Sequence, residues 1–320
     1  MKEADFEARR EQAWQEFDQL VGSLERNQKP PGVQELPRRF REVCADLALA
    51  SHRMYRSATL ERLNALVIRG YKLLYRQRRG GAEKVTRFVV REFPAAVRAD
   101  WRLFVLCSLF FWLPFFSMLL IAGNDLDWVR AILGPQQTAA MDSMYGSQAD
   151  SLSNMRKEFG SNFMMFGFYI WNNIGIDFRV FAGGVVAGLG TLFYLISNGL
   201  NIGAAAGYAT YACDPKAFWP FVAGHSAPEL VGMVIAGMAG MKLGIGVLRP
   251  GRMTRGKSLA AAAKQALPLI IGAAGMTFLA AIIEGFWSAQ DFPIATKYVF
   301  GGVMWLLHLA YFTLLGRRAA

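Results

Sequence analysis

Apolar residues are distributed differently in the two parts of this chain. In residues 1–100 they recur at helical spacing between charged positions, whereas residues 101–320 contain about six long apolar stretches. The first stretch, Trp101–Ala122, has a single charged residue close to its start. An apolar run of about 18 residues or more can cross a bilayer as a helix. The pattern therefore predicts an all-α integral membrane protein, with an N-terminal soluble helical bundle followed by a polytopic membrane helix bundle.

The soluble part is predicted to contain three helices with apolar stripes. Such stripes allow three antiparallel helices to bury them against one another; a coiled-coil arm that pairs with a second copy is the alternative. The Gly80-Gly81 pair marks the end of the third helix, so we place a cytoplasmic helical domain at residues 1–81. The stripes are Trp14, Phe17, Val21 and Leu24; Leu36, Phe40, Val43 and Leu47; and Leu60, Leu63, Val67 and Leu74.

Residues 82–95 have a different pattern. Val85, Phe88 and Val89 share one helical face, and the basic residues Lys84, Arg87 and Arg91 lie close by. This predicts a basic amphipathic helix on the inner membrane surface, which Pro94 ends. The alternative is one more helix of the bundle. The transmembrane domain then occupies residues 96–320.

The membrane part can be drawn as six spans, at about 101–122, 162–177, 180–199, 227–248, 259–284 and 297–316. Residues 1–100, the connection 249–257 and the tail from Gly316 are basic, which places both termini in the cytoplasm and residues 123–160 outside. Residues 200–225 are interrupted by Asp214, Pro215 and Pro220, so we expect them to re-enter from the outer side or to lie in the outer interface. Five spans plus a re-entrant segment is the alternative.

Composition and charge limit the classes of partner and site that fit this chain. The net charge is +11, and residues 1–100 hold 20 of the 35 Lys and Arg residues. Basic residues that flank membrane spans explain this charge, so we expect membrane lipids as partners and no nucleic acid. Cys44, Cys107 and Cys213 are too scattered to indicate a disulfide framework or a metal motif.

Pairs of glycines four residues apart predict close helix packing. Helices in lipid associate where small residues let their backbones approach. These faces can pack within one chain or between copies, and we expect a homo-oligomer, with a dimer as the first expectation. The pairs are Gly184 and Gly188, Gly203 and Gly207, and Gly240 and Gly244.

Polar residues inside membrane spans are costly to bury, which makes them candidates for function. Under the six-span topology, one group gathers toward the outer ends of spans, although His308 lies near the middle of the last. A second group lies at the inner end of the second span, where amides typically bridge helices. The candidate polar membrane site is His225, Glu229, Glu284, Asn198, Asn201 and His308, and the inner-end polar cluster is Asn172, Asn173 and Asp177.

The sequence His225-Ser-Ala-Pro-Glu229 allows three interpretations. Ser226 and Glu229 fit a capping box, in which Ser226 is the N-cap of the fourth span and His225 lies outside the helix. The segment could instead bind a polar ligand or a lipid headgroup. Finally, His225 and Glu229 could bind a metal ion, or perform acid–base chemistry, together with Glu284 or His308.

Signatures of known enzymes, such as H-E-x-x-H, Walker A or G-x-S-x-G motifs, are absent from the sequence, and no cofactor is expected. Through several segments and their order, the chain resembles the stage II sporulation protein M family. It is similar to the longer bacterial form of this family, which has an N-terminal domain. These segments are Phe40–Ala50, Leu63–Tyr71, Leu74-Tyr75, Phe93–Arg98, Asn172-Asn173, Asn198–Gly203, His225–Glu229 and Gly240.

The resemblance implies a non-enzymatic membrane scaffold, because the sporulation member of the family works with proteins that degrade septal peptidoglycan and localises or assembles them. The resemblance also implies the bacterial inner (cytoplasmic) membrane as the location, so we expect a protein there that recruits other envelope proteins. One alternative is a membrane protein that binds or transports a lipid or solute through its polar site. Another is a metal-dependent membrane hydrolase that uses His225, Glu229, Glu284 and His308.

Overall fold

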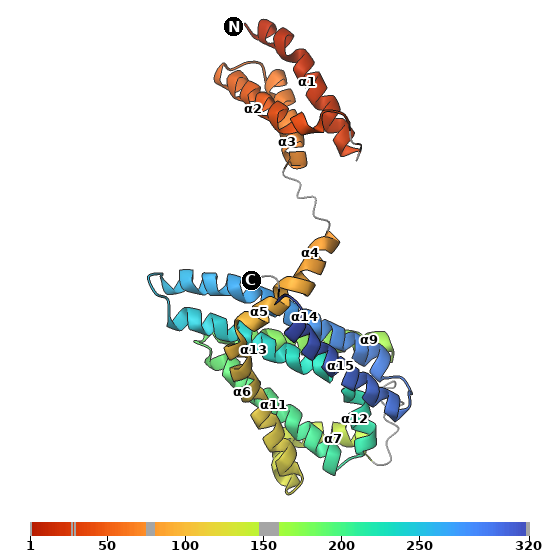
Figure 1. The fold of residues 1–320 in the computed structure, drawn as a ribbon. Helices are drawn as coiled ribbons and strands as arrows, with labels where there is room; N and C mark the ends of the chain where they lie inside the picture. The colour runs from red at the N-terminus through yellow and green to blue at the C-terminus, as the bar shows by residue number, and fades with distance from the viewer. Residues whose placement is uncertain (1, 27, 29, 75–80, 147–159, 318–320) are drawn as a thin grey trace. The chain divides into compact units, whose positions relative to one another are not determined.

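The computed structural model describes residues 2–26, 28, 30–74, 81–146 and 160–317. Every regular element in these ranges is a helix, as the sequence predicts. The chain divides into two compact units, Met1–Lys84 and Val85–Ala320, and each unit has its own apolar core (Figure 1). Tyr75, Gly80 and most of the predicted outer stretch after Gly146 lie outside the described residues.

The first unit contains the three predicted helices, α1 (Glu3–Glu25), α2 (Leu36–His52) and α3 (Ser57–Leu74), with a short 3-10 turn, η1 (Val33–Glu35), before α2. Their stripes meet in a common core, in which Phe17 and Leu63 are fully buried. The buried Asp46 carboxylate accepts hydrogen bonds from Trp14 Nε1 and Arg10 Nε, both at 2.8 Å. Gly81 does not end the third helix; it begins the next one, α4 (Gly81–Arg87).

The predicted surface helix does not end at Pro94. After α4 the chain continues through a π-helical turn, η2 (Phe88–Glu92), into α5 (Phe93–Ala99), whose first turn contains Pro94. The Phe93 amide donates to the carbonyl of Phe88, five residues back. In this pattern the carbonyl of Val89 would pair with Pro94, which has no N–H. It accepts instead from the Tyr311 hydroxyl at 2.6 Å. The π-helical turn η2 is therefore hydrogen-bonded to Tyr311 within the second unit.

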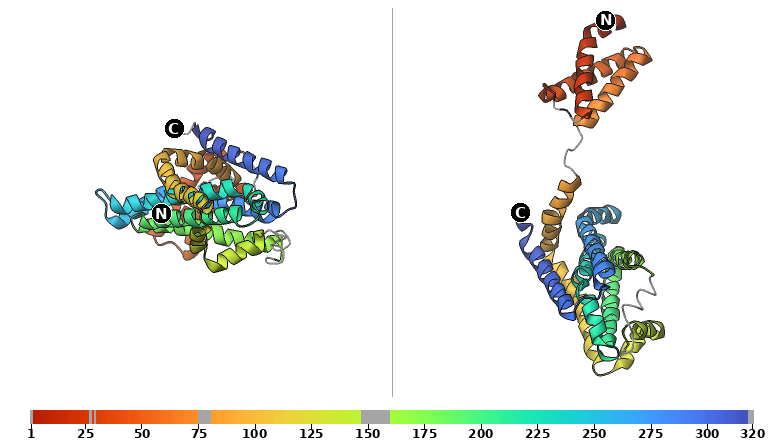
Figure 2. Two further views of the ribbon diagram at one scale, coloured as in Figure 1. Left: turned by 90° about the horizontal axis from the view of Figure 1, so that it is seen from below. Right: turned by 90° about the vertical axis from the view of Figure 1, so that its right-hand side faces the viewer.

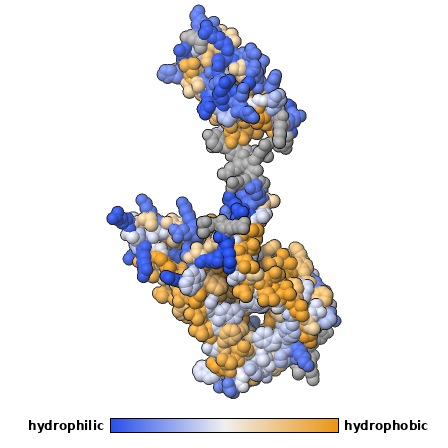
Figure 3. Space-filling view, in the orientation of Figure 1, coloured by the Kyte–Doolittle hydropathy of each residue, from blue (hydrophilic) through white to orange (hydrophobic). Residues whose placement is uncertain are grey.

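Three helices of the second unit, among the described residues, are long and apolar enough to cross a membrane. They are α6 (Trp101–Ala122), α13 (Ser226–Leu248) and α14 (Arg255–Ile282), which continues as the π-helical η5 (Ile283–Ser288). The helix α15 (Ile294–Leu314) follows. Apolar residues cover much of the visible face of this unit, whereas the described residues of the first unit present mostly polar ones (Figure 3). The second unit thus has the apolar helices of a membrane protein. The predicted count of about six spans is not confirmed.

The second and third predicted spans need correction. Residues 162–182 form α9 (Asn162–Tyr169), the π-helical η3 (Ile170–Ile174) and α10 (Gly175–Ala182), and a break that includes η4 (Gly183–Val185) separates them from α11 (Leu189–Tyr211). The predicted span 180–199 is therefore wrong. The break lies where a Cβ on Gly184 would overlap the backbone of Gly240 in α13, and where Gly188 has a φ of 82°. Backbones this close leave no room for side chains.

The prediction for residues 200–225 is also wrong in its first half. Residues up to Tyr211 complete α11, and only then does the chain turn into the short α12 (Pro215–Ala223). Gly203 and Gly207 lie against Phe115 and Ala122 of α6, so the two helices run side by side (Figures 1 and 2). Residues 123–160, which were predicted to lie outside, contain a helix that the sequence reading missed, α7 (Leu126–Tyr145), which packs on α11.

Candidate functional site

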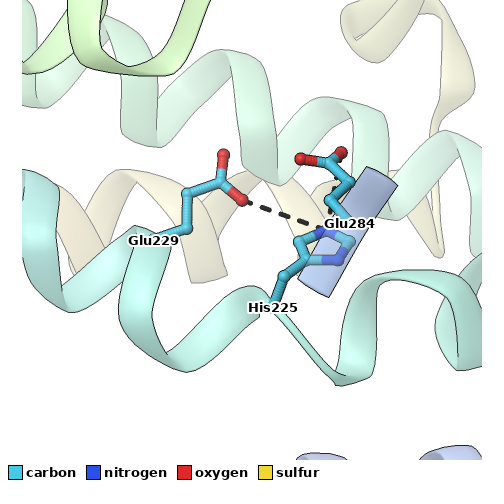
Figure 4. A group of neighbouring side chains, drawn as sticks. All are labelled: His225, Glu229 and Glu284. Carbon is cyan, nitrogen blue, oxygen red and sulfur yellow. Dashed lines mark ion pairs between the residues drawn. The ribbon is translucent and has the colours of Figure 1, made fainter. Parts of the chain in front are cut away.

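Three side chains that are far apart in the sequence converge where α13 begins and α14 ends. His225 directly precedes α13, Glu229 lies in its first turn, and Glu284 lies in η5 (Figure 4). His225 Nε2 is 3.9 Å from Glu229 Oε2 and 3.7 Å from Glu284 Oε1. One potential ligand atom from each residue lies within 4.8 Å of the other two. We call these residues the His–Glu–Glu cluster.

The start of α13 explains why two of these residues face each other. The capping-box interpretation is wrong, because the Ser226 hydroxyl donates to the Ala223 carbonyl at 3.2 Å and caps no amide of α13. His225 has near-helical dihedral angles, and its carbonyl accepts from the Glu229 amide at 3.2 Å. His225 thus joins the helical register, and the spacing of four residues brings its side chain next to Glu229.

The π-helical turn η5 supplies the other side of the cluster. It presents Glu284 to Nε2 of His225 and Ser288 to Nδ1, which is 3.1 Å from the Ser288 hydroxyl. The Ser288 carbonyl in turn accepts from the buried Lys297 ammonium at 3.0 Å. Single π-helical turns inside α-helices occur frequently at functional sites. Both ring nitrogens of His225 therefore face polar groups. Nε2 faces Glu284 and Glu229, and Nδ1 faces Ser288.

The cluster is shielded from solvent and incompletely hydrogen-bonded. His225 and Glu284 are 4% and 6% exposed, and the Glu229 side chain is 21% exposed. Among the described residues, no hydrogen-bond partner reaches the buried Glu284 Oε2. The distances from Nε2 to the two carboxylates are also too long for hydrogen bonds. Buried carboxylates normally have partners, so this arrangement suits an additional positively charged species.

A divalent metal ion fits the donors that are present. One imidazole nitrogen and two carboxylates are ligands that zinc accepts, at about 2.0–2.2 Å from the ion. In a tetrahedral site with such bonds, ligand atoms lie about 3.4 Å apart. The observed distances of 3.7 and 3.9 Å are only a few tenths of an ångström longer. Two carboxylates and a divalent ion together carry no net charge, which reduces the cost of burial in a membrane.

Comparison with known proteins identifies the membrane unit. Residues 103–289 match the family model described as Stage II sporulation protein M. The chain belongs to the stage II sporulation protein M family. The matched range contains His225, Glu229 and Glu284, so the cluster lies within the part that defines the family. Residues 4–76 match a separate model, described as Domain of unknown function (DUF8413).

Other relatives add little about this stage II sporulation protein M homologue. An uncharacterized protein of Methanocaldococcus jannaschii is 33% identical over 73 residues, which is 22% of the chain and 41% of the relative. The chain thus spans less than half of that relative. No solved structure matches the chain.

Three of the residues predicted for the polar membrane site of this homologue form other contacts. Asn198 donates to the Tyr194 carbonyl in its own helix, and Asn201 exchanges hydrogen bonds with Gln137 of α7 at 3.3 Å. His308 Nδ1 lies 2.7 Å from the carbonyl of Met304 in α15. The predicted outer site is therefore two separate features: the His–Glu–Glu cluster and a set of helix contacts.

The residues of the predicted inner-end cluster form hydrogen bonds within and between helices. Asn172 donates to Asn173 at 2.8 Å, and the buried Asp177 carboxylate accepts from Thr277 of α14. Asp177 is close enough to Glu229 for their charges to interact. The two predicted polar groups are therefore nearer to each other than a division between opposite membrane faces implies.

Sequence reasoning missed three polar residues around the cluster, namely Tyr169, Ser288 and Lys297. The Tyr169 phenol interacts with the Glu284 carboxylate. Ser288 could have been found, because it follows Glu284 by four residues in a largely apolar stretch and would share its helical face. Tyr169 and Lys297 belong to other helices, and their sequence positions carry no signal of this proximity.

Proposed function

We propose that this protein is an integral membrane protein of the bacterial inner membrane, with both termini in the cytoplasm. Its His–Glu–Glu cluster binds a divalent metal ion, and the activity of the protein depends on that ion. The observation that carries the proposal is the convergence of His225, Glu229 and Glu284, together with a buried Glu284 oxygen that has no hydrogen-bond partner among the described residues. Zinc suits this donor set best, because imidazole and carboxylate ligands in a four-coordinate site are typical of it.

The test is zinc binding by the full chain, purified in mild detergent without a histidine tag and stripped with EDTA. Elemental mass spectrometry after equilibrium dialysis against Zn²⁺ should give about one zinc ion per chain. His225→Ala and Glu284→Gln should abolish this binding. His308→Ala is the matched control, because His308 bonds only within its own helix among the described residues. Absence of zinc from the wild type, or equal loss in His308→Ala, would refute the proposal.

A second candidate function, the membrane scaffold that the family resemblance implies, is supported by the separate core of residues 1–84. On α3, Ile68 is 46% exposed, although it is large and apolar. We propose that this face binds a partner envelope protein or a second copy of the chain, as a dimer. Crosslinking in cells should yield a discrete product that Ile68→Asp removes and Met54→Asp, at another exposed apolar position, leaves intact. A crosslinking pattern that Ile68→Asp does not change would exclude this face.

A further inference from the structure

The hydrogen bonds around His225 extend beyond the three candidate ligands. Its Nδ1 contacts the Ser288 hydroxyl at 3.1 Å, and the backbone carbonyl of the same serine accepts from Lys297 Nζ at 3.0 Å. Ser288 is fully buried and Lys297 is 6% exposed. These contacts join η5, the residue before α13 and the start of α15 in one buried path.

This path supplies a hydrogen-bond acceptor for Nδ1 of His225, the ring nitrogen that does not face the two carboxylates. A histidine that binds a metal through one nitrogen almost always donates the hydrogen on its other nitrogen to a nearby acceptor. When Nδ1 carries the hydrogen it donates to the Ser288 hydroxyl, and the lone pair of Nε2 points toward Glu229 and Glu284. The opposite tautomer would direct an N–H toward the same two carboxylates and prevent coordination through Nε2.

Lys297 contacts Ser288 rather than His225. The Ser288 carbonyl lies at the end of η5, where backbone acceptors lack partners in the helix itself. The Lys297 ammonium comes from α15 and satisfies this carbonyl. A buried ammonium is costly. Its charge interacts with that of Asp291, and its hydrogen bond fixes the position of the Ser288 carbonyl.

We propose that Ser288 and Lys297 are positioning residues of the metal centre: the Ser288 hydroxyl accepts the hydrogen on Nδ1 of His225 when Nε2 binds the ion, and Lys297 holds Ser288 in place. This inference rests on the metal-binding function proposed above. It predicts that both residues control zinc affinity without contacting the ion.

The test measures zinc affinity by competition with a chromophoric chelator in the full chain. Ser288→Ala should weaken zinc binding by about 10–100-fold. Lys297→Met should also weaken zinc binding, whereas Lys297→Arg, which keeps the positive charge, should bind zinc like the wild type. Ser226→Ala is the matched control, because this neighbour of His225 donates to the Ala223 carbonyl and accepts from Trp305. It should bind zinc like the wild type.

A second readout separates positioning from general stability. The chain has three histidines, so ¹⁵N labelling of histidine gives few signals, and His225→Ala assigns the relevant one. In the zinc-loaded protein His225 should show the Nδ1–H tautomer. A zinc-loaded wild type with hydrogen on Nε2, or Ser288→Ala with unchanged affinity, would overturn this inference alone. A wild type that binds no zinc would instead overturn the proposed function, and the two failures are therefore distinguishable.

Discussion

Glu284→Gln provides a sharp test of the metal centre, because its effect on stability should reverse with zinc. The Glu284 carboxylate is 6% exposed and has one oxygen without a hydrogen-bond partner among the described residues. Without metal, an unsatisfied buried group of this kind costs about 1–3 kcal/mol. The neutral amide of Gln cannot become a second buried negative charge beside Glu229. In EDTA the variant should therefore melt at a higher temperature than the wild type.

Zinc should invert this order. A ligand that binds only the folded state adds about 4.1 kcal/mol of stability at 1,000 times its dissociation constant. For a domain of about 150–250 residues, this corresponds to a rise in melting temperature of about 8–16 °C. The wild type should gain this increase, whereas Glu284→Gln should gain almost none. At saturating zinc the wild type should thus melt at the higher temperature.

The assay is thermal unfolding followed by intrinsic tryptophan fluorescence in detergent, with EDTA or with zinc buffered at known free concentrations. His308→Ala should follow the wild type in both conditions. An equal zinc-induced rise for the wild type and Glu284→Gln would refute the reasoning, because the ion would then bind elsewhere. A wild type that does not respond to zinc would refute the metal centre itself.

Two further predictions concern packing in the membrane unit. Gly184→Ala should sharply lower the yield of folded protein on size-exclusion chromatography, because its Cβ would overlap the backbone of Gly240; Gly275→Ala, with no atoms within 4 Å of the new Cβ, should leave the yield unchanged. Tyr311→Phe removes the hydroxyl that donates to the Val89 carbonyl and should destabilise the protein by about 1 kcal/mol. Thermal unfolding measures this effect, and an unchanged melting temperature would show that the contact does not stabilise the fold.

Local sequence patterns were sufficient for the three N-terminal helices and for α6, α13 and α14. Their apolar residues recur at the helical period or form long uninterrupted runs, which depend only on neighbours along the chain. Breaks within the membrane unit were not predictable in this way. The interruption before Gly188 and the continuous α11 both depend on which helix lies opposite, since α13 contacts the former and α6 the latter.

The candidate site shows the same division. The sequence by itself determined that His225, Glu229 and Glu284 stand in apolar surroundings, where ionisable groups are costly and hence informative. Only the tertiary structure decided that these three meet, that Asn198, Asn201 and His308 do not join them, and that Ser288 and Lys297 stand behind His225. The physical reason is that helix register and the π-helical turn η5 set the direction of each side chain, and neighbouring helices then determine which side chains come into contact.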